Sequence, residues 1–110
     1  MKNHFSILAM FTVLAAAPAL AEDREDILTA GAALFRTADC ITCHAIDKKM
    51  IGPPFKEIAA RYKDDKGAED RLAEKVRKGG SGNWGSVAMV PHAAMAEEDV
   101  RTLVKWVLVQ

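Results

Sequence analysis

The sequence predicts an all-α domain of four short helices around a large bound group, and three observations lead to this prediction. Apolar residues recur at helical spacing near both ends of the chain, and no segment alternates as a strand would. The stretch GGSGNWGSVAMVPHAAM (residues 79–95) has neither period, yet it carries apolar side chains that need something to wrap. A small helical core alone gives only marginal stability, so we expect a nonprotein group at the centre.

Four helices account for the periodic segments. The two terminal helices, at residues 23–36 and from residue 97 onward, have acidic residues in the first turn, where the helix dipole favours them. We expect their apolar faces to pack on each other, and Gly31 in the first face would allow a close approach. Two shorter helices are expected between them, one after the breaker Gly52-Pro53-Pro54 and one at about residues 68–78.

The first 21 residues have the three parts of a cleaved secretory signal peptide. They are a basic start at Lys2, an apolar run at residues 5–17 and the small-residue ending Ala19-Leu20-Ala21. The run is shorter than the roughly 20 residues that a membrane-spanning helix needs. Residues 22–110 would then form one domain in the periplasm. Lys and Arg balance Asp and Glu at 15 each in the whole chain, so no nucleic-acid-binding or membrane-binding surface is expected.

The only two cysteines, Cys40 and Cys43, belong to the motif CITCH, which ends in His44. A redox dithiol would need a βαβ framework. A structural zinc site would have only His92 to complete its four ligands, without the second closely spaced pair that such sites use. A disulfide that closes so short a loop would stabilise little and leave His44 unexplained. In C-x-x-C-H the two thiols instead add to the two vinyl groups of haem, and the His coordinates its iron. We therefore expect one covalently attached haem c.

The second axial ligand of the iron decides between an electron carrier and a site that binds small molecules. The candidates after residue 21 are Met50, Met89, Met95 and His92. Met50 is too near His44 in the chain to reach the opposite haem face well, and packing against the last helix accounts for Met95. Met89 lies in the middle of the apolar loop and is favoured, with His92 as its competitor.

The segments CITCHAIDKKMIGPPFKEIAARY, GGSGNWGSVAMVPH and LVKWVLVQ together resemble the small bacterial class I cytochromes c of the cytochrome c-551 type. The resemblance extends over essentially the whole of residues 22–110. It implies the class I cytochrome c fold, with four to five short helices around one covalently bound haem and no sheet. It also implies that Cys40 and Cys43 form the thioether bonds and that His44 and Met89 are the iron ligands.

The resemblance implies supporting roles for three further residues. The carbonyl of Pro53 would accept the ring N–H of the proximal His and make that ring a better ligand. Trp84 would hydrogen-bond a haem propionate. Lys75 stands where the family often has an arginine with a similar role toward the propionate. The family also commonly has several prolines around the ligand Met and an Asn soon after it. Here Val90 and then His92 follow Met89, so we expect a less rigid ligand loop.

With both axial positions filled, no vacant site remains for a substrate, so we expect a soluble periplasmic one-electron carrier and not an enzyme. The resemblance implies redox partners: a quinol-oxidising complex upstream, and a terminal oxidase, nitrite reductase or peroxidase downstream. We expect a monomer that docks through an apolar haem edge with charges such as Lys48 and Lys49. Two alternatives stay open. One is a haem protein with an absent or displaceable Met89 that binds or senses a small molecule, and the other is a subunit of a membrane complex that retains its leader.

Overall fold

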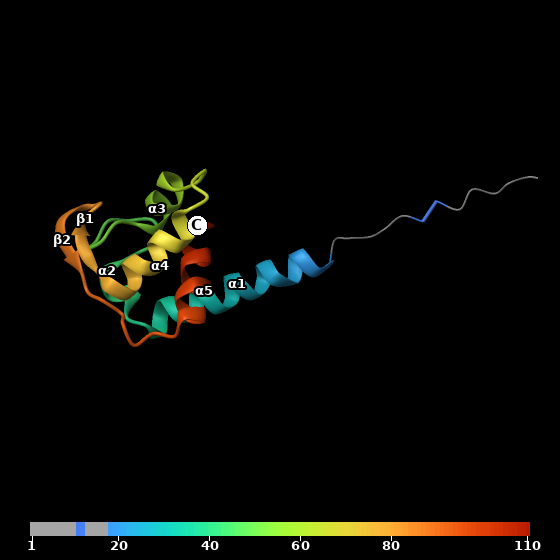
Figure 1. Cartoon of the computed structure of the whole chain (residues 1–110), viewed down its shortest axis with the longest axis horizontal. Helices are drawn as coiled ribbons and strands as arrows, with labels where there is room; N and C mark the ends of the chain where they lie inside the picture. The colour runs from blue at the N-terminus through green and yellow to red at the C-terminus, as the bar shows by residue number, and fades with distance from the viewer. Residues whose placement is uncertain (1–10, 13–17) are drawn as a thin grey trace, which may run out of the picture.

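The computed structural model describes residues 11–12 and 18–110, in which five helices and two short strands occur (Figure 1). Along the chain they are α1 (Pro18–Thr37), α2 (Cys40–Cys43), α3 (Phe55–Arg61), α4 (Ala68–Lys78), β1 (Gly80–Gly82), β2 (Gly85–Met89) and α5 (Glu97–Leu108). Most of the expected signal peptide lies outside the described residues. None of the helices within them is long and apolar enough to cross a membrane.

The helix boundaries agree with the sequence-based expectation in the second half of the chain. Helix α4 has the expected bounds, and α5 begins at the expected Glu97. Helix α1 begins earlier than expected, at Pro18, because proline suits the first turn of a helix and the following Ala and Leu residues favour helix. Helix α2 was not predicted, because a segment of four residues is too short to show a period.

The expectation of no strand is wrong for one hairpin. Strands β1 and β2 pair antiparallel, with Gly80 opposite Met89 and Gly82 opposite Gly85. Gly82 and Gly85 flank the two-residue turn with φ of 115° and 105°, which side chains other than glycine rarely adopt. Nearly every residue of both strands is exposed. The usual alternation of buried and exposed residues is therefore missing from the sequence.

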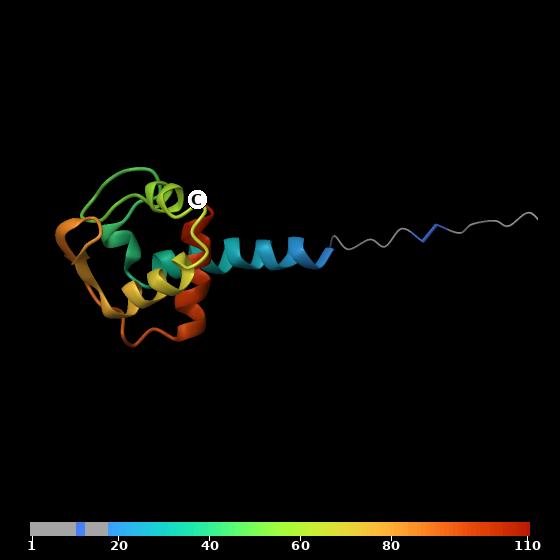
Figure 2. The same ribbon diagram turned by 45° about the horizontal axis from the view of Figure 1, so that its top comes forward.

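The helices at the two ends of the chain pack on each other, as predicted, and Figures 1 and 2 show α5 crossing α1. At the crossing, a Cβ added to Gly31 would come within 3.0 Å of several atoms of the Trp106 side chain. Phe35 and Phe55 surround the same indole, with ring centroids 5.4 and 5.7 Å from it. The predicted close approach at Gly31 is therefore confirmed.

Helix α4 packs on α5 through a second buried cluster, next to the first. Ala73 and Val100 are 0% exposed and lie against Val104. At the surface, Arg101 of α5 donates a 2.6 Å hydrogen bond to Asp70 of α4. This packing places α2, α4 and the hairpin at the end of the molecule away from the start of α1 (Figure 2).

Candidate functional site

Helix α2 brings the CITCH motif into a single turn. Cys40 and Cys43 are three residues apart, which places both thiols on one side of the turn. The N–H of His44 donates a 2.9 Å hydrogen bond to the carbonyl of Cys40 and closes the turn. His44 itself is extended, with φ of −124° and ψ of 146°, so the chain leaves the helix at this residue.

Both cysteines are free thiols, but their surroundings differ. Cys40 is buried at the edge of the core, whereas Cys43 is half-buried. Burial raises the pKa of the Cys40 thiol, and the nearby charge of Asp39 acts in the same direction. Cys40 therefore lies next to apolar side chains that disfavour its charged form, and no disulfide joins the pair.

The segment after the motif folds back on it and places Pro53 beside His44. The Gly52 N–H donates to the Cys43 carbonyl at 2.8 Å, and the Phe55 N–H donates to the Ala45 carbonyl at 3.0 Å. The Nδ1 atom of His44 then lies 2.8 Å from the carbonyl oxygen of Pro53. A carbonyl can only accept, so Nδ1 carries the proton and Nε2 keeps its lone pair for a ligand role.

Packing holds the His44 ring in this orientation. The imidazole is 9% exposed and stacks on Phe55, with ring centroids 5.0 Å apart and an interplanar angle of 25°. Gly52 also lies against the ring, where an added Cβ would come 2.8 Å from Nδ1 and 2.9 Å from Nε2. Only glycine leaves room for the ring here. The requirement for glycine at residue 52 could not be predicted from the IGPP sequence alone.

The second group of predicted residues lies at the end of α4. Met89 is the half-buried last residue of β2, and its segment crosses close to Gly79, where a Cβ would meet the backbone of residues 89–91. The His92 N–H donates a 2.9 Å hydrogen bond to the carbonyl of Val76. The segment that carries Met89 thus contacts the end of α4 at two points, through residues 89–91 and through His92.

His92 has an unusual side chain for its position. Among the described residues, its Nδ1 is the one buried side-chain nitrogen or oxygen without a hydrogen-bond partner. Leaving such a group unpaired costs about 1–3 kcal/mol. This unpaired atom lies three residues after Met89. It fits a site that is completed by a bound group, as the haem interpretation expects.

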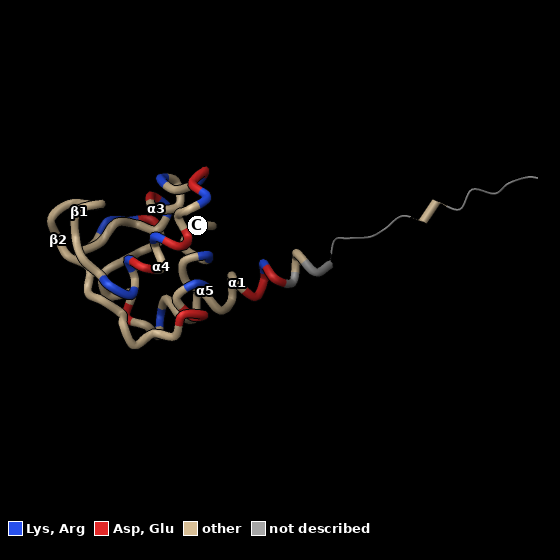
Figure 3. The backbone as a smooth tube through the Cα atoms, in the orientation of Figure 1, with Lys and Arg blue, Asp and Glu red and all other residues tan. Residues whose placement is uncertain are grey.

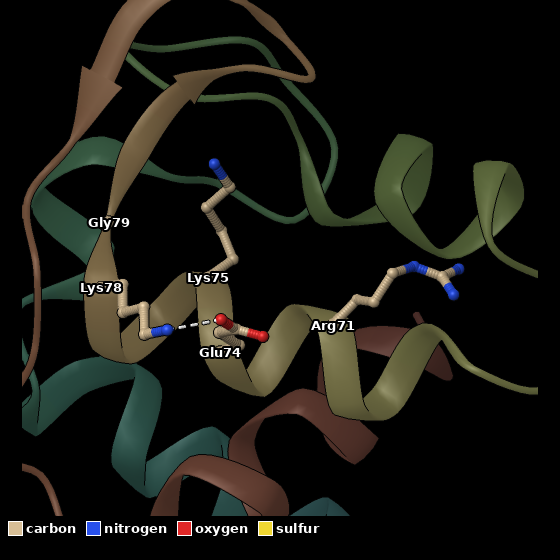
Figure 4. Close-up of a pocket in the computed structure, with 5 residues that line it drawn as sticks. All are labelled: Arg71, Glu74, Lys75, Lys78 and Gly79. Atoms are coloured by element: carbon tan, nitrogen blue, oxygen red, sulfur yellow. Dashed lines mark hydrogen bonds and ion pairs between the residues drawn. The ribbon is translucent and has the colours of Figure 1, made fainter.

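Lys75 lies on α4 and Trp84 in the turn of the hairpin. Figure 4 shows Lys75 extending from α4 toward the hairpin, while Lys78 turns away and pairs with Glu74 at 2.6 Å. These side chains, with Arg71 and Gly79, line an open pocket of about 250 Å³. Trp84 stands at the hairpin tip, 39% exposed.

Arg61 is a residue of this region that sequence reasoning missed. Its guanidinium lies 4.4 Å above the centroid of the Trp84 ring and donates a 2.6 Å hydrogen bond to the carbonyl of Asn83. It ends α3, and no local pattern links it to a turn 22 residues away. Only the tertiary fold brings them together, through the reach of the long Arg61 side chain.

The helical fold, the C-x-x-C-H turn and the oriented histidine define a class of protein that holds a covalently attached haem. The model of the Cytochrome c family matches residues 28–109. The chain belongs to the cytochrome c family. Within it, the relatives described next show a class I cytochrome of the c-551 type, which confirms the resemblance found in the sequence.

The relatives cover most of the chain. It is 47% identical over 78 residues to cytochrome c-551 of Azotobacter vinelandii, which covers 71% of this chain and 94% of that protein. It is 43% identical over 105 residues to cytochrome c-551 of Pseudomonas aeruginosa, which covers 96% of this chain and 92% of that protein. The crystal structure of Nitrosomonas europaea cytochrome c552 matches with a TM-score of 0.68 and 38% identity, over 71% of this chain and 96% of that one.

Membership of this family settles the broad function. The chain is a small electron-carrier cytochrome and not an enzyme, its cofactor is a covalently bound c-type haem with iron, and its partners are redox proteins. The predicted fold class is confirmed as well, with the small hairpin as an addition.

Proposed function

We propose that the chain is a periplasmic electron carrier in which Cys40 and Cys43 would attach the haem and His44 and Met89 would hold its iron. The observation that carries this proposal is the 2.8 Å hydrogen bond from His44 Nδ1 to Pro53, because it leaves Nε2 free to coordinate. When bound, the haem supplies reversible one-electron oxidation and reduction at iron.

The protein's part is to keep the ligands in place in both oxidation states. Phe55 and Gly52 both pack against the His44 ring, and the Pro53 carbonyl makes it a better ligand. The thioether of Met89 is a soft ligand that favours the reduced iron. Its segment is attached to α4 through the His92 N–H bond to Val76, which limits its movement away from the site.

Lys75 and Trp84 would receive the haem carboxylates. Lys75 offers an ammonium group on the hairpin side of α4, and Trp84 offers an indole N–H from the hairpin tip. A cation and a neutral donor together offset the cost of placing carboxylates near an apolar site.

Export to the periplasm is supported by the leader pattern in residues 1–21. The match to Pseudomonas aeruginosa cytochrome c-551, over 105 residues, also extends beyond the matched region of the family model. Residues 22–110 would be the mature monohaem domain, a monomer. It would take electrons from a quinol-oxidising complex and pass them to a terminal oxidase, nitrite reductase or peroxidase. N-terminal sequencing of the exported protein should give Glu22 first, and a retained leader would contradict this.

The absorption spectrum of the exported, haem-loaded protein tests the ligand assignment. We expect the weak red charge-transfer band of oxidised iron bound to methionine sulfur. It should disappear in Met89→Ala and survive in His92→Ala. A low-spin spectrum without the band would assign the position to His92, and a high-spin spectrum with carbon monoxide binding at neutral pH would support a ligand-binding protein instead. Haem that stays with the wild-type chain on a denaturing gel, but not with a Cys40→Ala, Cys43→Ala double variant, would establish the attachment sites.

A further inference from the structure

We propose that Arg61 is a positioning residue of the haem site, which fastens the tip of the β1–β2 hairpin to α3 and holds the Trp84 indole in place. The proposal rests on the function proposed above, because it concerns the side chain assigned there to a haem carboxylate. It adds a residue and a role that the ligand assignment does not contain.

Two contacts from one guanidinium carry the proposal. The Arg61 Nη1 donates a 2.6 Å hydrogen bond to the carbonyl of Asn83, and the Arg61 Cζ lies 4.4 Å from the centroid of the Trp84 ring. Asn83 and Trp84 are the two residues of the turn between Gly82 and Gly85. Arg61 therefore contacts the whole tip of the hairpin, with its backbone in one contact and its aromatic ring in the other.

The hairpin needs such a contact. Its strands are short, rich in glycine and exposed on both faces, and an isolated two-stranded hairpin is only marginally stable. Its base is anchored where the Gly79 N–H donates to Lys75 at 2.7 Å and the His92 N–H donates to Val76 at 2.9 Å. Among the side-chain hydrogen bonds of residues 18–110, the one from Arg61 is the one that reaches the tip.

The chemistry of arginine suits both contacts at once. A planar guanidinium can lie on an indole face while the N–H groups at its edge donate in the plane. A lysine could make one of these contacts, but not both with the same geometry. None of the ion pairs formed by the described residues includes Arg61, so no carboxylate draws it from the ring. Its charge stays next to the face of the Trp84 ring.

Hydrogen exchange in the reduced, isotope-labelled holoprotein tests the proposal. Arg61→Gln should raise the exchange rate of the Trp84 indole N–H by about two- to fivefold, the range expected for loss of an exposed cation–π contact. The buried Trp106 indole serves as the internal reference and should not change. Arg61→Lys should fall between the wild type and Arg61→Gln. Arg71→Gln is the control. It removes an arginine of α4 that pairs with Asp65 and lines the same pocket as Lys75, and it should leave the Trp84 exchange rate unchanged.

The midpoint potential provides a second readout that a purely structural contact would not move. Arg61→Gln should lower the potential, because a displaced Trp84 leaves the negative charge of the haem carboxylate less offset, and that charge favours the oxidised, more positive iron. If Arg61 acts through Trp84, its substitution should shift the potential less in a Trp84→Phe background than in the wild type.

Two results would overturn the proposal. One is a Trp84 exchange rate that is the same in Arg61→Gln and Arg71→Gln, and the other is an equal potential shift with and without Trp84. Exchange at Trp84 is measured independently of which residue is the distal ligand. A missing methionine band would therefore count against the ligand assignment alone, while an intact band with unchanged Trp84 exchange would count against the role of Arg61 alone.

Discussion

The Nδ1 atom of His44 bonds to the carbonyl of Pro53, and the residues before and after the Pro53-Pro54 pair, Gly52 and Phe55, both contact the imidazole ring. The Pro53 carbonyl lies 2.8 Å from Nδ1, and the Phe55 ring centroid lies 5.0 Å from that of the imidazole. One short segment thus supplies the hydrogen bond, the stacking partner and the space. Such support decides which ring nitrogen faces a metal and how firmly it is held.

Gly52→Ala should therefore damage the site. The added methyl would come 2.8 Å from Nδ1 and 2.9 Å from Nε2 of His44, so the ring or the loop must move. We expect a loss of about 1–3 kcal/mol in the free energy of unfolding of the holoprotein, as for other overpacked positions. Guanidinium unfolding followed at the haem absorption band measures it. Gly67→Ala is the matched control, because the nearest atom there is the movable end of Arg71. Equal stability of the two variants would contradict the role of Gly52.

Gly31→Ala should destabilise the crossing of α1 and α5. Helix propensity alone would favour alanine by about 1 kcal/mol. The new methyl, however, would overlap with the Trp106 side chain, and overpacking costs about 1–3 kcal/mol. A net loss of stability in thermal unfolding is the expected result. Ala30→Val adds bulk to the exposed side of the same helix and should change stability little. A stabilised Gly31→Ala protein would show that the helices can separate without penalty.

The carboxyl group of Glu74 should titrate below its ordinary range. Its hydrogen bond to Lys78 is the main cause of the lowered pKa, and the charge of Lys78 adds to it. The sign follows: this pair stabilises the fold above the unfolded pKa of the carboxyl, and the contribution is lost as pH falls through the lower folded pKa. An NMR titration of Glu74 should show the pKa rising in Lys78→Met and staying low in Lys78→Arg. An unchanged pKa in Lys78→Met would assign the shift to other charges.

Docking to redox partners should depend on local rather than overall charge. Residues 79–96 contain no Lys, Arg, Asp or Glu, which Figure 3 shows as an uninterrupted tan segment through the hairpin. The exposed Lys48 and Lys49 lie on the loop after the motif. Reversing both to Glu should slow electron transfer with a redox partner protein at low salt, and higher ionic strength should reduce the difference. Reversing Lys63 and Lys66 makes the same change in net charge and should have a smaller effect. Equal effects of the two pairs would indicate steering by net charge.

The periodic elements could be predicted from the sequence, and the contacts between distant segments could not. Helix α4 has the predicted bounds because its apolar residues repeat clearly and Gly79 ends it. The hairpin was not predicted, because both its faces are exposed and its sequence therefore lacks the alternating hydrophobic pattern of a strand. Its glycines have positive φ values, which a hydrophobic pattern does not reveal. The contact of His44 with Pro53 followed from family resemblance. Arg61 on Trp84 did not, because the residues lie far apart in the chain and no period relates them.

The packing of α1 on α5 has a consequence for the order in which the molecule is completed. Trp106, close to the end of the chain, closes the core against Gly31, which stands before the cysteine motif. Contacts of such long sequence separation cannot form until the last helix has been synthesised. The motif at residues 40–44 therefore stays reachable on the growing chain, and thiol chemistry there can precede the closing of the fold around it.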